Sequence, residues 1–198
     1  PEGYYQIETF GMVTPIALMV VTIAVGAKAL AGEEANRTIG VLLANPVSRS
    51  KVVADKAITM VAFGVVVGVA TFAGVSAGNW IGGLDMSYAN IAATSALATL
   101  IGLLFGALAL LLSAATGLLR LAIFAPVAAA VIAHVLNAMA ELNDAGWGRW
   151  LPFHYYLGSD PLNNGMAWGD AGILLAITVL LVALAYPAFN RRDLRQTG

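Results

Sequence analysis

One group of polar residues has the types and the spacing of a chemical site. His134, Asn137 and Glu141 follow one another at intervals of three and four within an apolar stretch, so in a helix they share one face. Ionisable groups at membrane depth are costly, and such a stripe can line an export path or bind a cation. Hydrogen bonding between helices, with Glu141 near the lipid headgroups, is the structural alternative.

Other kinds of chemistry find little support in the sequence. The chain has no Cys, which excludes disulfides, thiolate catalysis and Cys-ligated zinc. Its two His, His134 and His154, are too few for a histidine metal cage. The net charge of −1 comes without a basic face for nucleic acid. We therefore expect no catalytic centre, no metal and no cofactor in this chain.

The composition indicates a lipid environment for the whole chain. Hydrophobic residues fill 60% of the 198 positions and charged residues 11%, whereas soluble domains are nearer half apolar and a quarter charged. About 20 mostly apolar residues cross the hydrocarbon core. The sequence therefore predicts an all-α membrane helix bundle, a single transmembrane domain over residues 1–198. Its five predicted spans are roughly 9–31, 57–81, 89–116, 121–142 and 169–189.

The basic residues divide unevenly between the two ends of such a bundle. Nine of the ten Lys and Arg fall in one set of connections, and only Arg149 falls in the other. Because cytoplasmic loops are rich in Lys and Arg, Pro1 is predicted outside and Gly198 inside. An odd number of spans with an external start suggests a further helix before Pro1, giving six in the full unit. All four Trp lie on the predicted outer side: Trp80, Trp147, Trp150 and Trp168.

Small and hydroxyl residues within the spans predict how the helices pack. Three pairs of Gly four residues apart allow close approach inside the bundle or, alternatively, in a dimer: Gly64 and Gly68, Gly74 and Gly78, Gly102 and Gly106. Five hydroxyl residues are expected to bond to their own helix backbone: Thr94, Ser95, Thr99, Ser113 and Thr116.

The longest predicted cytoplasmic connection, residues 32–56, has an ordered pattern. Charged residues at its start lead into a short apolar run, which Pro46 ends by pushing the residue before it out of the helical region. Ser48 or Ser50 is then placed to cap the next helix. The apolar run either lies in the lipid interface or docks in a groove of a cytoplasmic partner.

This connection resembles the signature loop of permeases of the type-2 ABC exporter class. The resemblance rests on the acidic pair Glu33-Glu34, the run from Arg37 to Leu43, and the turn Pro46-Val47-Ser48-Arg49. Residues 152–165 resemble the external segment before the last helix of that family, and residues 189–194 resemble its cytoplasmic tail. The resemblance covers the whole chain, as helices two to six.

The resemblance implies a permease that exports an amphipathic small molecule, drug or lipid across a bacterial cell membrane. It implies a second permease unit and an ATP-binding subunit, which would hold ATP and magnesium. It also implies a gate at Glu33 and Glu34, and an external helical segment over residues 143–168. A coupling helix, Thr38 to Asn45, would contact the ATPase, and the expected contact residues are Arg37, Thr38, Ile39, Val41, Leu42, Leu43, Asn45, Pro46 and Arg49.

No G-x-x-x-x-G-K-[ST] sequence occurs, so under the exporter interpretation ATP hydrolysis would have to take place in a partner.

Two competing interpretations follow from the same residues. A secondary transporter or channel would instead use the face of His134, Asn137 and Glu141 for ion coupling. A membrane anchor or lipid-modifying enzyme is the third possibility, but an enzyme would need clustered polar groups. The candidate carboxylates are scattered: Asp85, Asp144, Asp160 and Asp170.

Overall fold

The computed structural model describes residues 5–36, 38 and 48–192. Within these ranges there is no strand, and five helices are long and apolar enough to span a membrane. The predicted all-α bundle is confirmed. The second span begins at Arg49 rather than near 57, because a hydropathy pattern does not register polar first turns of a helix. The five spans are Thr9–Ala35, Arg49–Gly82, Tyr88–Thr116, Leu119–Leu142 and Trp168–Asn190.

The first span changes its helical geometry along its length, whereas the other four are single α-helices. It starts within a π-type helix, η1 (Tyr5–Val13), and continues through α2 (Thr14–Ala27), a second π-type helix η2 (Lys28–Gly32) and the short α3 (Glu33–Ala35). The remaining spans are α5 (Arg49–Gly82), α6 (Tyr88–Thr116), α7 (Leu119–Leu142) and α10 (Trp168–Asn190). Between α7 and α10 lie η3 (Gly146–Trp150), α8 (His154–Leu157) and α9 (Pro161–Asn164).

Local capping explains where α5 begins and where α5 and α6 end. Ser48 caps α5, since the backbone N–H of Lys51 donates to its hydroxyl at 3.2 Å, so Ser48 rather than Ser50 takes the predicted role. The helices α5 and α6 end at Gly83 and Gly117, which adopt left-handed φ angles of 56° and 65°. Glycine reaches this region without steric cost.

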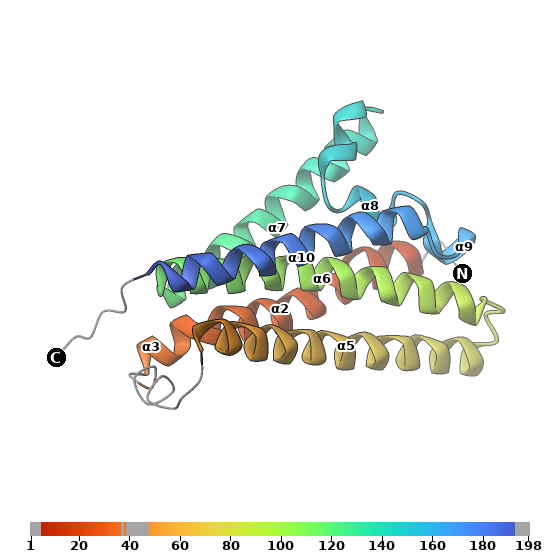
Figure 1. Cartoon of the computed structure of the whole chain (residues 1–198). Helices are drawn as coiled ribbons and strands as arrows, with labels where there is room; N and C mark the ends of the chain where they lie inside the picture. Colours follow the sequence, from red (N-terminus) through yellow and green to blue (C-terminus); the bar gives the residue numbers. More distant parts are fainter. Residues whose placement is uncertain (1–4, 37, 39–47, 193–198) are drawn as a thin grey trace.

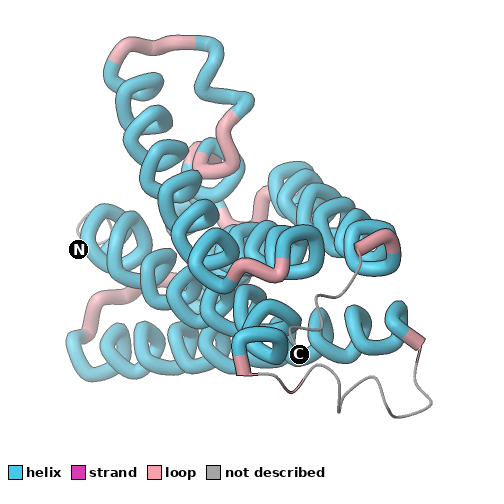
Figure 2. The backbone as a smooth tube through the Cα atoms, turned by 90° about the vertical axis from the view of Figure 1, so that its left-hand side faces the viewer, coloured by secondary structure: helices cyan, strands magenta, loops and turns pink. Residues whose placement is uncertain are grey.

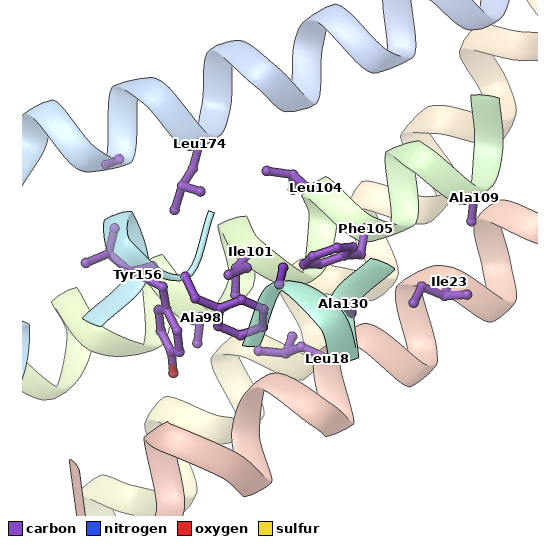
Figure 3. Packing of buried hydrophobic residues seen from close by; sticks show 14 of the residues in the cluster. Leu18, Ile23, Ala98, Ile101, Leu104, Phe105, Ala109, Ala130, Tyr156 and Leu174 are labelled. Atoms are coloured by element: carbon purple, nitrogen blue, oxygen red, sulfur yellow. The ribbon is translucent and has the colours of Figure 1, made fainter. Parts of the chain in front are cut away.

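Helix α6 lies at the centre of the bundle. The most apolar 18-residue window of α6 is 67% buried, against 17% in α5, 17% in α7 and 22% in α10. Helices α2, α5, α7 and α10 all contact it (Figure 1). Its core residues Ile101, Leu104 and Phe105 pack with Leu18 of α2 and Leu174 of α10 (Figure 3). The outer helices are therefore left with apolar faces of the kind that lipid covers.

Helix α7 diverges from the other long helices toward its C-terminal end (Figures 1 and 2). Its exposed apolar side chains include Val131, Val135 and Met139. The chain then turns back through η3 and returns to the bundle at α8, which contacts both α6 and α10. This divergence separates α7 from the first span and leaves room between them.

Glycine allows α2 and α6 to approach closely. A side chain at Gly26 would overlap the carbonyl oxygen of Gly106, and one at Gly106 would lie 2.7 Å from Cβ of Thr22. The hydroxyl of Thr22 donates to the carbonyl of Gly102 at 2.6 Å, which fixes the pair. Packing inside the bundle also explains Gly64 and Gly68. A side chain at Gly64 would overlap Leu103, and a side chain at Gly68 would overlap Thr99. Gly74 and Gly78 have no described atom within 4 Å of such a side chain.

We expect the variant Gly26→Ala to destabilise the chain by about 1–3 kcal/mol, because the added methyl group meets backbone that cannot move aside. Gly74→Ala is the matched control. It adds the same methyl group where nothing described lies nearby, so its effect should stay within about 1 kcal/mol. Thermal unfolding in detergent checks both variants. Equal melting temperatures would contradict the packing described for α2 and α6.

Candidate functional site

A network of ion pairs and hydrogen bonds joins four spans at one end of the bundle. We call this the basic end, since the described Lys28, Arg49, Lys56, Arg120 and Arg192 gather there. At this end α2, α6 and α10 finish and α5 and α7 begin (Figure 1). The opposite end, which holds Trp80, Trp147, Trp150 and Trp168, is the tryptophan end.

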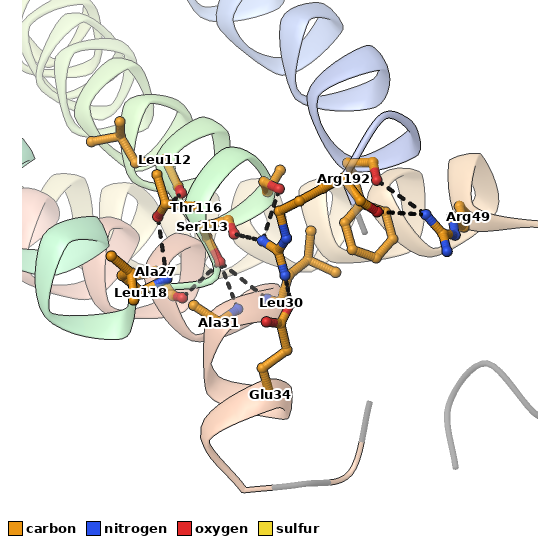
Figure 4. Close-up of polar contacts among 12 residues, drawn as sticks. Ala27, Leu30, Ala31, Glu34, Arg49, Leu112, Ser113, Thr116, Leu118 and Arg192 are labelled. Atoms are coloured by element: carbon orange, nitrogen blue, oxygen red, sulfur yellow. Dashed lines mark hydrogen bonds and ion pairs between the residues drawn. The ribbon is translucent and has the colours of Figure 1, made fainter. Parts of the chain in front are cut away.

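Ser113 connects α6 to the first span at the basic end (Figure 4). Its hydroxyl donates to the carbonyl of Ala27 at 2.9 Å and accepts the N–H groups of Ala31 at 2.8 Å and Leu30 at 3.3 Å. The expectation that Ser113 bonds to its own helix is therefore wrong. The π-type turns of η2 are wide, and the hydroxyl satisfies backbone groups there. Thr94, Thr99 and Thr116 do bond to their own helices. The expectation is also wrong for Ser95, whose buried hydroxyl has no hydrogen-bond partner among the described residues.

Arg192, just after α10, pairs with Glu34 and also binds α6. Its Nη1 donates to the carbonyls of Ser113 at 3.2 Å and Ala114 at 3.0 Å. These carbonyls belong to the last turn of α6, where the helix dipole favours a cation. Gly117 follows directly, and any side chain there would overlap Glu34. Burial lowers the pKa of Arg192, yet a guanidinium keeps its proton at neutral pH.

Arg49 performs a similar role at the start of α5. Its Nη1 donates to the carbonyls of Arg192 at 3.1 Å and Phe189 at 3.4 Å, and its guanidinium lies 5.7 Å from the centre of the Phe189 ring. Arginine suits this position because its planar group both donates several hydrogen bonds and stacks on aromatic rings. The first turn of α5 is thus fixed to the last turn of α10.

A second ion pair, between Glu33 and Lys56, joins α3 to α5. The ammonium of Lys56 lies 2.7 Å from Oε1 of Glu33, and both side chains are about three quarters covered. The hydroxyl of Thr38 donates to the same carboxylate, and the Thr38 N–H donates to the Glu33 carbonyl at 2.8 Å. Both flanks of the 39–47 segment are therefore held to the long helices.

A large groove lies between the first span and α7, toward the tryptophan end. Its volume is about 1150 Å³, and α8 and its flanking residues close one end. His134, Asn137 and Glu141 all line it, as expected for residues on one helix face. Asn137 donates from Nδ2 to Oε1 of Glu141 at 2.7 Å, and the His134 ring meets Phe153 edge-on at 5.0 Å. The remaining lining is mostly apolar.

Tyr156 of α8 fixes the end of this groove. Its side chain is fully buried beneath α10 (Figure 3), and its hydroxyl donates to the carbonyl of Phe10 at 2.6 Å. Burial raises the pKa of the Tyr156 phenol, so it remains a neutral donor. Asn90 of α6 holds the next short helix by donating to the carbonyls of Leu162 and Asn163. The 143–168 segment is thereby fastened to η1 and α6.

The sequence matches a known family over nearly its full length. The family model is described as ABC-2 family transporter protein, and the match covers residues 4–194. The chain belongs to this family. A comparison with curated proteins gave no match. As an ABC-2 family permease, the chain is a membrane transport component and is not itself catalytic. Membership of this family implies, in general, an ABC ATP-binding partner. The secondary-transporter and enzyme interpretations have no comparable support.

The described part of this ABC-2 permease brings together both expected gate residues, Glu33 and Glu34, but only two of the expected contact residues, Thr38 and Arg49. Glu33, Glu34, Thr38 and Arg49 all belong to the network at the basic end. Outside the described residues lie Arg37, Ile39, Val41, Leu42, Leu43, Asn45 and Pro46, so their part in coupling stays a prediction. The sequence analysis did not assign Lys56, Ser113 or Arg192 to a site. Their position near the end of a span was the one feature of the sequence that could have identified them.

Proposed function

We propose that this ABC-2 family chain is the permease subunit of an exporter that moves an amphipathic small molecule, drug or lipid outward. In this proposal it pairs with a second permease unit in the bacterial plasma membrane. ATP and magnesium are held by a partner ATP-binding subunit at the cytoplasmic side. The gathering of Lys and Arg at one end supports this sidedness, since cytoplasmic ends of membrane proteins carry that excess.

The observation that carries the proposal is the double attachment of the connection between α3 and α5. On its first flank, Glu34 is tied through Arg192 to the last turn of α6. On its second flank, Arg49 is tied to the last turn of α10. Ion pairs and hydrogen bonds with little solvent exposure resist displacement more than a solvated loop does. A push on this connection would therefore move several spans together.

The proposed coupling helix, Thr38 to Asn45, is the segment that receives this push. Its apolar run of Ile39, Val41, Leu42 and Leu43 suits docking in a groove of the ATP-binding partner. Glu33 and Glu34 would act as the gate, because their ion pairs close the basic end between the first span and its neighbours. Opening would require these pairs to separate.

The groove between α2 and α7 is the proposed substrate path. Its lining residues on α7 run from Ile123 to Glu141, about 27 Å along the helix axis. This length is close to the thickness of the hydrocarbon core, about 30 Å. An apolar, elongated groove suits a molecule with a long apolar part and disfavours highly charged cargo.

The experiment that tests the proposal is gentle purification of the full-length permease from its native membrane, followed by an assay of ATP hydrolysis. We expect a P-loop ATP-binding chain to co-purify and to hydrolyse ATP faster in the complex than alone. A preparation that contains no ATP-binding chain, and that moves solute in response to an ion gradient, would contradict the proposal.

A further inference from the structure

We propose that the groove recognises the cationic head of its substrate through Asn137 and Glu141, and that the substrate is an amphipathic amine. This inference deepens the proposed function and rests on it for the direction of transport. The binding itself depends only on the residues that line the groove. Three observations lead to it: an unsatisfied buried oxygen, the charge of the lining, and the apolar walls.

The unsatisfied oxygen belongs to Asn137. This side chain is 7% exposed, and its Oδ1 has no hydrogen-bond partner among the described residues. One N–H of its Nδ2 donates to Glu141, and Oδ1 is the buried atom that is left without a partner and can accept from a ligand. A buried acceptor without a partner costs about 1–3 kcal/mol. A substrate that supplies an N–H donor at this position would remove that cost.

The charge of the lining favours a cation. Glu141 is the single carboxylate among the described residues that line the groove, and none of them is Lys or Arg. Arg149 follows α7, but its guanidinium lies over the Trp150 ring, 6.0 Å from the ring centre. Hydrogen bonds between an ammonium and a carboxylate are about twice as strong as neutral ones. An anionic head would meet the like charge of Glu141 and no Lys or Arg. The two imidazoles in the lining, those of His134 and His154, lie edge-on to the rings of Phe153 and Tyr155.

The apolar walls of the groove determine which kind of chain the ligand carries besides its cationic head. Met12, Ile16 and Val20 line the groove from the first span, and Val127 and Val131 line it from α7. All five of these residues are at least 40% exposed in the chain alone, so a ligand chain would cover them. Burial of each methylene contributes about 0.8 kcal/mol. The groove therefore fits a primary amine or guanidine that carries a long alkyl or aryl chain.

The test measures binding of radiolabelled dodecylammonium and of neutral dodecanol to the full-length permease complex in nanodiscs of uncharged lipid. The variant Glu141→Gln removes the charge but still accepts the bond from Asn137. Asn137→Leu removes the free oxygen at similar volume. The matched control is Asp144→Asn, which removes a carboxylate close to Glu141 but outside the groove lining, and Asn tolerates the left-handed φ of 47° found there.

We expect Glu141→Gln to weaken dodecylammonium binding about tenfold and to leave dodecanol binding unchanged, because dodecanol carries no charge. We expect Asn137→Leu to weaken dodecylammonium binding about fivefold. Asp144→Asn should bind both probes as the parent does. The proposal is overturned if either groove variant binds dodecylammonium with the parent's affinity, because water rather than substrate would then satisfy Asn137. ATP hydrolysis by each preparation is recorded separately. Its absence in the parent would refute the exporter function and leave the binding comparison intact.

Discussion

Replacing Arg192 by Gln is expected to abolish most of the stimulation of ATP hydrolysis that the permease gives its ATP-binding partner, a loss of roughly tenfold. Glu34 would then keep its charge at a position only 20% exposed, and two carbonyls of α6 would lose their donor. Leaving one member of such a pair uncompensated costs about 2–4 kcal/mol. Displacement of the connection between α3 and α5 would then separate these contacts instead of moving α6. ATP hydrolysis in the reconstituted complex, divided by that of the ATP-binding chain alone, measures this.

Arg191→Gln is the matched control for Arg192→Gln, because Arg191 is the adjacent residue and is exposed. It should leave the stimulation unchanged. The double variant Glu34→Gln with Arg192→Gln should be less impaired than either single variant, since no unpaired charge remains. If Arg192→Gln stimulated the partner as well as Arg191→Gln does, Arg192 would have no part in coupling.

The second large effect is expected from replacing Leu42 and Leu43 together by Asp. Two carboxylates in place of two leucines would have to be desolvated in an apolar groove of the partner, which costs several kcal/mol. We therefore expect the ATP-binding chain to be lost from the purified complex. Replacing both leucines by Met keeps the apolar surface and should retain the partner. Retention by the Asp variant would place the contact elsewhere on the chain.

The long helices could be predicted from the sequence because each depends on local composition. A run of apolar residues identifies a span wherever it packs, and Ser48 after Pro46 marks the start of α5 by its own hydrogen bond. The shared face of His134, Asn137 and Glu141 likewise follows from helical spacing alone. The groove that these residues line does not, because it depends on the divergence of α7 from α2.

The network at the basic end could not be predicted, because its partners are far apart along the chain. Ser113 bonds to backbone groups more than 80 residues away, and Arg49 to carbonyls about 140 residues away. Sequence spacing carries no information about such pairs. Ser113 illustrates this limit. Thr99 and Thr116 donate to carbonyls of their own helix, whereas the Ser113 hydroxyl donates to the carbonyl of Ala27 in the first span.

The central claim, that ATP-driven movement enters the permease through the connection between α3 and α5, has a direct test. The chain contains no Cys, so single cysteines can be introduced without removing others. Leu43→Cys and Trp80→Cys place a thiol in the proposed coupling helix and at the tryptophan end. After treatment of the native complex with a short bifunctional crosslinker, we predict a covalent adduct with the ATP-binding chain from Leu43→Cys alone. An adduct from Trp80→Cys, or none from Leu43→Cys in an intact complex, would contradict the account.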